Sequence, residues 1–386
     1  MAADVASPSR RARGVRSALN LASGVSLSIV PPAVLSISTN TFPVAEQGIV
    51  AVAVTTATFL SQLNFGAVIE SRLSSTRTSR FVAVPLWLTT LGLIAATATV
   101  VFHSAPLVVC LALPFLFAVL EVGRGVSVAE GYPYRELWSA IALGVGATVG
   151  VIASLMHQPW GLAAIGIGIA AAILIRAVRA PRIAPRPDPA IRGWVVADVG
   201  LTGITYPVLN TVILALLGPA ASVIFAAVST VSGLLAIPLN FLRVRLLKEH
   251  SPLDIVVTAC ALLFAAVVIG IAEFTGLLSR AFGTTWTVAD TILPLLVASL
   301  WRIATLFSAI PFAALRRAGH AKLVMILRGA SALLTFGLAV PSTMFGQIWI
   351  VFAALLIGEL VLALNCEIAR RRLGLVHDGT TADVAP

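Results

Sequence analysis

Charged residues are scarce in this chain, at 11% of its 386 residues, whereas water-soluble domains usually carry about 25%. Hydrophobic residues make up 59%, more than a soluble domain can bury. The three cysteines, Cys110, Cys260 and Cys366, lie inside apolar stretches, so we expect no disulfide framework. The five histidines fit no metal-site spacing. The sequence therefore predicts an integral membrane protein without a bound metal or cofactor.

Motifs for nucleotide and nucleic-acid binding are also missing. No Walker-type phosphate loop is present, so we expect no ATP hydrolysis. Gly144, Gly146 and Gly150 lie within an apolar run, where they predict a face for close helix packing and not a nucleotide fingerprint. The net charge of +10 comes from short basic clusters between apolar runs, without interleaved aromatic residues. That distribution excludes a nucleic-acid partner.

Apolar runs long enough to span a bilayer recur along the whole chain. In lipid every backbone polar group needs an internal partner, so we expect these runs to be α-helices. The sequence predicts an all-α integral membrane protein with about twelve transmembrane helices. The first six cover 17–38, 46–68, 81–103, 105–123, 136–156 and 159–178, and the second six cover 194–217, 220–242, 253–277, 288–313, 322–343 and 347–368.

Basic residues mark one side of the predicted bundle. They fall in the N-terminal segment, in every second loop after it and in the C-terminal segment, and only Arg280, Arg302 and Arg328 depart from this pattern. Cytoplasmic loops carry the excess of Lys and Arg. We therefore expect both chain ends to lie in the cytoplasm, and a multi-pass protein of the cytoplasmic membrane.

The two halves of the chain resemble each other at a shift of 176 positions. Leu63-Asn64-Phe65 falls on Leu239-Asn240-Phe241, and Pro43 falls on Pro219. This predicts two pseudo-symmetric six-helix bundles related by an axis along the membrane normal. The predicted parts are a cytoplasmic tail 1–16, a bundle 17–178, a cytoplasmic linker 179–192, a bundle 193–369 and a cytoplasmic tail 370–386.

Two pairs of segments stand out in the sequence: Phe42–Gly48 through Gly66 with Leu217–Ala221 through Asn240, and the turns Ala281–Trp286 and Ala313–His320. They resemble the corresponding segments of polysaccharide (Wzx-type) flippases. These flippases belong to the MOP superfamily, with the MATE drug exporters and the lipid II flippase. The resemblance implies a MATE-like fold that exports a lipid-linked oligosaccharide, held on a polyprenyl pyrophosphate, by alternating access. It also implies that the first, second, seventh and eighth helices line the cavity.

Two other functions remain open at this stage. A major-facilitator-type exporter of small molecules also has six plus six helices with both ends inside, and 66–80 faintly echoes its loop between the second and third helices. A membrane-embedded enzyme of lipid-linked sugar assembly usually needs a sizeable outer loop, whereas the outer loops here are short. We therefore expect a transporter and not an enzyme, acting among membrane lipids and beside glycosyltransferases or a polymerase of the same pathway.

Two charges fall near the middle of predicted spans, where a charge costs about 2.5–3.5 kcal/mol. Arg302 lies in the tenth span and Glu359 in the last. They either form a structural ion pair within the second bundle or serve as an ion-linked switch or a contact for an anionic head-group. Arg328 is close enough to the inner end of its span to extend its side chain into the cytoplasm.

Several uncharged and acidic residues are further candidates for substrate or cation contacts. Asp198 and Asn210 are twelve residues apart on the seventh helix, a little over three turns, and so share roughly one face. Gln62 and Asn64 on the second helix, with Asn240 on the eighth, lie near inner ends. The plain alternatives are a snorkelling acid and a helix–helix hydrogen bond for the first pair, and helix caps for the other three residues.

Overall fold

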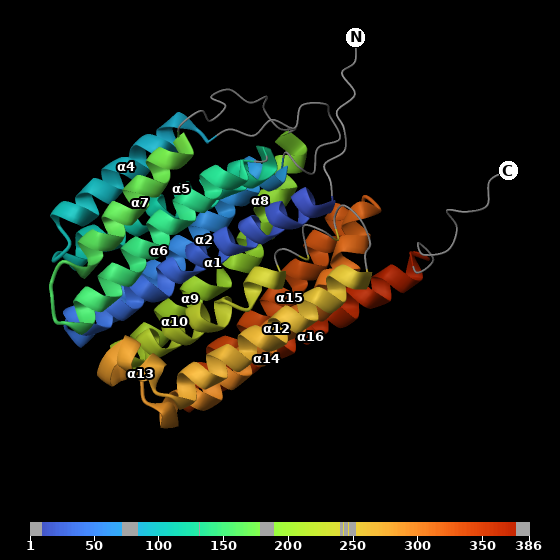
Figure 1. Cartoon of the computed structure of the whole chain (residues 1–386). Helices are drawn as coiled ribbons and strands as arrows, with labels where there is room; N and C mark the ends of the chain where they lie inside the picture. The colour runs from blue at the N-terminus through green and yellow to red at the C-terminus, as the bar shows by residue number, and fades with distance from the viewer. Residues whose placement is uncertain are drawn as a thin grey trace, which may run out of the picture.

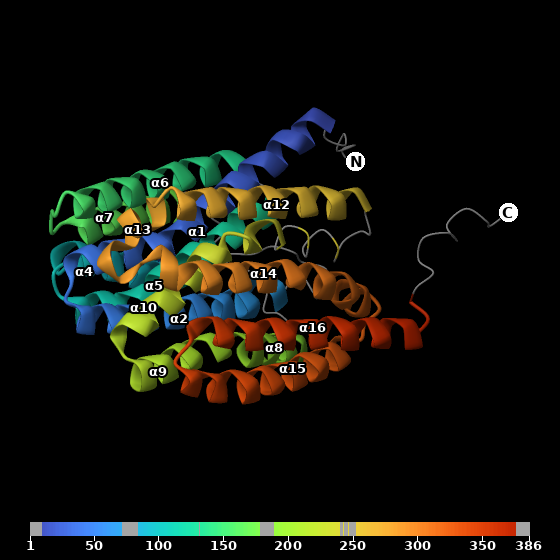
Figure 2. The ribbon, with the colours of Figure 1, turned by 90° about the horizontal axis from the view of Figure 1, so that it is seen from below.

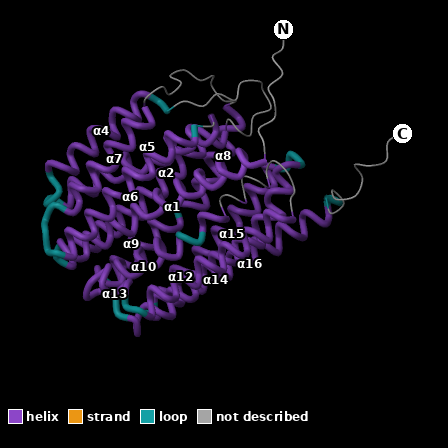
Figure 3. The backbone as a smooth tube through the Cα atoms, in the orientation of Figure 1, coloured by secondary structure: helices purple, strands orange, loops and turns teal. Residues whose placement is uncertain are grey.

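The computed structural model describes residues 10–71, 84–130, 132–177, 189–239, 242, 246 and 252–375. These ranges are helical, with short connecting turns and no strand (Figure 3). The first half contains α1 (Arg10–Thr41), α2 (Val44–Phe65) with its π-helical extension η1 (Gly66–Glu70), α4 (Leu86–Val101), α5 (Pro106–Glu130), α6 (Pro133–Leu155) and α7 (Gly161–Ala177).

The second half contains eight α-helices in the described ranges. They are α8 (Pro189–Gly203), α9 (Thr205–Leu217), α10 (Pro219–Gly233), α12 (Pro252–Phe274), α13 (Leu277–Phe282), α14 (Val288–Arg317), α15 (Ala321–Ser342) and α16 (Ile348–Arg372), with short 3-10 turns η2 (Gly283–Thr285) and η3 (Thr343–Phe345). Helices α8 and α9 together form the seventh span.

The helices of the described chain agree with the prediction of about twelve spans. By length and composition, eight helical segments of the described chain could cross a membrane, and α4, α7 and α10 are shorter apolar helices. The long helix α1 completes the set. The start of α1 and the end of α16 lie at the same end of the bundle, and α13 lies at the other (Figure 1). We call these the inner and outer ends.

Several predicted boundaries differ from the structure. Helix α1 begins at Arg10, inside the predicted tail 1–16, and α16 continues to Arg372. Helix α8 begins at Pro189, inside the predicted linker 179–192, and 178–188 lie outside the described residues. The hydropathy of a span ends at the bilayer surface, whereas its helix continues into water wherever backbone hydrogen bonding continues.

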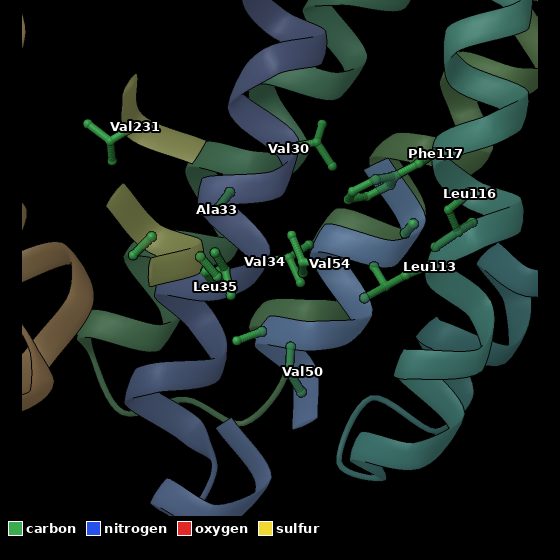
Figure 4. Packing of buried hydrophobic residues seen from close by; sticks show 14 of the residues in the cluster. Val30, Ala33, Val34, Leu35, Val50, Val54, Leu113, Leu116, Phe117 and Val231 are labelled. Atoms are coloured by element: carbon green, nitrogen blue, oxygen red, sulfur yellow. The ribbon is translucent and has the colours of Figure 1, made fainter. Parts of the chain in front are cut away.

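The two halves of the chain form two neighbouring groups of helices. Helices α1 to α7 lie together on one side, and α8 to α16 on the other (Figures 1 and 2). One hydrophobic core contains residues of both groups, among them Val231 of α10, Leu35 of α1 and Val54 of α2. Leu113 of α5 points toward α2 within it (Figure 4). The outward surface is apolar as well, with Phe264 and Phe274 of α12 among its exposed residues. Lipid is the solvent that such a surface requires.

Helices α6 and α7 approach each other closely through glycines. A Cβ on Gly146 would lie 2.9 Å from the Cα of Gly168, and one on Gly150 would lie 2.6 Å from the carbonyl oxygen of Gly161. The predicted packing face is thus confirmed for Gly146 and Gly150. It is wrong for Gly144, whose Cβ would meet no described atom within 4 Å.

Candidate functional site between the two helical halves

The contact between the halves is made by few helices. Helix α2 packs against α8, α9 and α10, and α1 packs against α10 and α13. The first, second, seventh and eighth spans therefore line this interface, which is the placement that the family resemblance implies for a substrate path.

A cluster of four charged side chains lies at the inner end of the interface. Arg316 of α14 forms an ion pair with Glu70 at the end of η1, and a second one with Asp198 of α8, at 2.6 Å from Nη2 to Oδ2. Arg328 of α15 pairs with the same Oδ2 at 2.9 Å. The guanidinium groups of Arg316 and Arg328 each lie 4.8 Å from the ring centroid of Phe312. We call Glu70, Asp198, Arg316 and Arg328 the inner charge cluster.

The four side chains of the inner charge cluster are buried more deeply than ionised side chains usually are. Asp198 is 2% exposed and Arg316 is 10% exposed, while Glu70 and Arg328 are 16% and 18% exposed. Two arginines face two carboxylates, so the formal charges of the cluster cancel. The expectation that Arg328 extends into the cytoplasm is wrong, because its guanidinium is held by Asp198.

Asn210 has a different environment from Asp198. Its Oδ1 accepts a hydrogen bond from Ser222 of α10 at 2.9 Å, and its Nδ2 lies 3.4 Å from the hydroxyl of Thr55 on α2. The backbone stays helical between α8 and α9, because Ile204 N–H bonds the carbonyl of Gly200 at 3.1 Å and its own carbonyl accepts from Val208 at 3.3 Å. Pro207 has no N–H for the carbonyl of Gly203, which removes one helical hydrogen bond there. That Asp198 and Asn210 share roughly one helix face stays a prediction.

Neutral contacts join the halves at the outer end. Ser36 and Asn40 of α1 donate hydrogen bonds to the carbonyl of Ala281, at 2.6 and 2.9 Å. The outer turn is held in the second half by the buried carboxylate of Glu273, which accepts from the indole of Trp286 at 2.8 Å and from the hydroxyl of Thr291 at 2.6 Å.

The two charges predicted near mid-span take different partners in the structure. The guanidinium carbon of Arg302 lies 3.9 Å from the ring centroid of Trp301 and 5.7 Å from that of Tyr206. Glu359 accepts a hydrogen bond from the hydroxyl of Ser308. Within the described ranges Arg302 Nε has no hydrogen-bond partner.

A cavity of about 70 Å³ lies inside the second half near these residues. Such a volume holds one or two water molecules, because a water occupies about 30 Å³ in the liquid. Its wall includes the hydroxyls of Thr305 and Ser308 and the side chains of Arg328 and Cys366. The cavity therefore lies between Glu359, through Ser308, and the inner charge cluster, through Arg328.

The remaining candidates are Gln62, Asn64 and Asn240, which the sequence places near inner helix ends. Gln62 is exposed, and Asn64 donates to the carbonyl of Leu60 in its own helix at 2.8 Å. Their interpretation as helix caps is wrong, because η1 continues the helix to Glu70. Asn240 lies outside the described residues.

The sequence analysis missed Glu70 and Arg316 as functional candidates. Glu70 appeared only in an echo of another family, and Arg316 was counted among the basic residues that set topology. An available signal was the acid itself, because Glu70 stands at the inner end of a span just before a basic loop. Among the described residues, no group of His, Cys, Asp and Glu could hold a metal ion.

Comparison with known proteins adds the fold family. No protein-family model and no curated protein matches the sequence. Solved structures do match, including an outward-facing MATE family multidrug resistance transporter of the MOP superfamily, at 16% identity and a TM-score of 0.57 over 94% of this chain and 96% of that one. The chain has the fold of the MATE transporters. A MATE protein in the bent conformation matches at 17% identity and a TM-score of 0.56, over the same shares of both chains.

The MATE fold bears on how the interface between the two halves is interpreted. A chain of two helical bundles that meet along the first, second, seventh and eighth spans was predicted as MATE-like, and that fold class is confirmed. At 16% and 17% identity the likeness establishes the architecture. The substrate has to be inferred separately, from the side chains at the interface.

Proposed function

We propose that this chain is a transporter that flips a lipid-linked oligosaccharide, carried on a polyprenyl pyrophosphate, across the cytoplasmic membrane by alternating access. The observation that carries the proposal is the MATE fold, with its two bundles meeting along α1, α2 and α8 to α10. A MATE-like interface can open toward one membrane face at a time if the bundles rock against each other. The sequence segments that resemble Wzx-type flippases support the oligosaccharide substrate.

Arg302 is the residue that we assign to the anionic head-group. Its guanidinium is stacked on Trp301, and its Nε has no hydrogen-bond partner within the described ranges, so that donor is available. Arginine binds phosphate oxygens in a bidentate manner. Glu359 lies in the same half and is tied to Ser308, where it supplies a site for an ion-linked step. Asp198 and Asn210 then contribute to the path indirectly, through the contacts that hold the halves together.

The major-facilitator alternative loses its support, because the architecture is that of MATE proteins. The remaining competitor is export of a small organic molecule, since the MATE structures that match include one described as a multidrug resistance transporter. Within the proposal the chain is not an enzyme, needs no cofactor, and takes its substrate from glycosyltransferases or delivers it to a polymerase.

A flipping assay tests the proposal directly. Purified protein is reconstituted into liposomes that contain a fluorescent polyprenyl-pyrophosphate oligosaccharide, and movement between leaflets is read by quenching of the accessible dye. We expect transfer above that of empty vesicles, and a lower rate for Arg302→Gln. The matched control is Arg317→Gln, which removes an exposed charge from the same helix. No transfer, together with efflux of an organic cation from the same vesicles, would transfer support to small-molecule export.

A further inference from the structure

The two ends of the interface are joined by different kinds of contact. At the outer end the contacts are neutral: Ser36 and Asn40 bond a carbonyl, and a Cβ on Gly48 would lie 2.9 Å from Pro219. At the inner end the contact includes the ion pair between Glu70 and Arg316. Within the described ranges, every other ion pair lies inside one half of the chain. The charge contact between the halves is thus confined to the inner end.

The partners of Arg316 differ in which half they belong to. Glu70 belongs to the first half, whereas Asp198 belongs to the second half together with Arg316 itself. If the inner ends separate, Arg316 keeps Asp198 and its stacking contact with Phe312, while Glu70, already 16% exposed, is released into water. Separation of the inner ends would therefore leave no buried charge without a partner. Breaking an ion pair is costly when one of its charges stays buried and unpaired. The contact between Glu70 and Arg316 avoids that cost and can form and break reversibly.

The backbone at Glu70 is specialised for this position. Residues Gly66–Glu70 form a π-helical turn at the end of α2, and such turns occur frequently at functional sites. The turn is packed on α8, because a Cβ on Gly66 would lie 3.2 Å from Val199 Cγ2. An i→i+5 turn rotates the residues after it relative to an unbroken α-helix, and here it ends with the carboxylate of Glu70 on Arg316.

We propose that the inner charge cluster is the inner gate of the transporter, and that the ion pair between Glu70 and Arg316 is the contact that closes it. Asp198 and Arg328 keep Arg316 in place in the second half while the gate is open. The proposal rests on alternating access, but it concerns the conformational equilibrium and not the substrate.

Distances between spin labels on the two halves test the gate. One label is placed on Tyr134→Cys of α6 and the other on Lys322→Cys of α15, both exposed at the inner end. An outer pair at Val101→Cys and Met344→Cys, also exposed, reports the opposite face. The native cysteines are replaced in this background, and distances are measured by pulsed electron paramagnetic resonance in reconstituted protein.

We expect Glu70→Gln to raise the ratio of inner-open to inner-closed protein by roughly 10- to 150-fold, the change that loss of one hydrogen bond between charged groups produces. The matched control is Glu367→Gln, which removes the same charge from ion pairs inside α16, and it should leave the distances unchanged. Arg316→Gln should open the inner end as well, and the double variant should add little to the larger single effect, because both changes remove one contact.

A change of salt concentration tests the gate without substituting any of its residues. Raising ionic strength from 0.1 to 1 M shortens the screening length from about 10 to about 3 Å, but a partly buried pair is screened less than an exposed one. The labelled protein should therefore shift toward the inner-open state by less than Glu70→Gln does, and Glu70→Gln itself should not respond further. Unchanged inner distances in Glu70→Gln, or equal changes in Glu367→Gln, would overturn the gate. Altered distances without oligosaccharide transfer would leave the gate in place and refute the proposed substrate.

Discussion

The ion pair between Glu136 and Arg176 provides a sharp test of how the first half is held together. Glu136 of α6 is completely buried and Arg176 of α7 is 3% exposed. Arg176 Nε donates to Glu136 Oε2 at 3.0 Å, and Nη1 donates to the carbonyl of Leu120 on α5 at 3.0 Å. The guanidinium therefore joins three helices.

Removing one partner leaves the other charge buried, which costs about 3–5 kcal/mol. Arg176→Met leaves the Glu136 carboxylate buried without its cationic partner, and it also leaves the Leu120 carbonyl without its donor. We expect Glu136→Gln to be milder, because the amide oxygen still accepts from the guanidinium, whereas Arg176→Met carries the full cost. If unfolding releases about 2.1 cal/mol/K per residue, a loss of about 4 kcal/mol lowers the midpoint of unfolding of the 386-residue chain by roughly 5 °C.

Thermal unfolding in detergent, followed by size-exclusion chromatography of heated samples, measures this difference. The double variant Glu136→Leu with Arg176→Met should recover much of the loss, since well-packed apolar residues often replace a buried ion pair at little cost. The matched control is Arg371→Met, which breaks an ion pair whose arginine is 73% exposed and should change stability little. A midpoint for Arg176→Met equal to that of Arg371→Met would refute the argument.

Three further predictions follow from the packing. Gly146→Ala should lower stability because its methyl group meets the backbone of α7, whereas Gly144→Ala should be neutral or stabilising by up to about 1 kcal/mol, both read from unfolding midpoints. Asn210→Leu should lower stability by about 1–3 kcal/mol, because the buried hydroxyl of its partner on α10 loses its acceptor, and an unchanged midpoint would contradict this. Glu273→Leu should lower stability by a similar amount by leaving the Trp286 indole without an acceptor, while Glu273→Gln should restore most of it.

Much of the architecture followed from the sequence because lipid imposes simple rules. Twelve spans and two groups of six could be predicted, since the apolar runs and the alternation of arginines are set by the bilayer and not by tertiary contacts. The close packing at Gly146 was predictable for the same reason, because small residues let membrane helices approach. The helix ends at Arg10 and Pro189 were missed, because hydropathy does not register a helix that continues into water.

The site was less predictable, because it depends on which helices meet. Asp198 was chosen from its depth in the membrane, and the structure places it at the centre of the inner charge cluster. Its partners Arg316 and Arg328 lie on α14 and α15, more than a hundred residues away in sequence, so no spacing rule could join them to Asp198. Arg302 and Glu359 were chosen for the cost of burying charge, and the sequence alone could not show that Trp301 and Ser308 contact them.

The seventh span lacks one helical hydrogen bond between two anchors, because Pro207 has no N–H for the carbonyl of Gly203. Helix α8 carries Asp198, which belongs to the inner charge cluster, and helix α9 carries Asn210, which is bonded to α2 and α10. Helices bend most readily where a proline leaves a carbonyl without its helical donor. A change of angle between the two halves of the molecule would therefore be taken up at Gly203 more easily than elsewhere in this span, with the hydrogen bonds of Asn210 left intact.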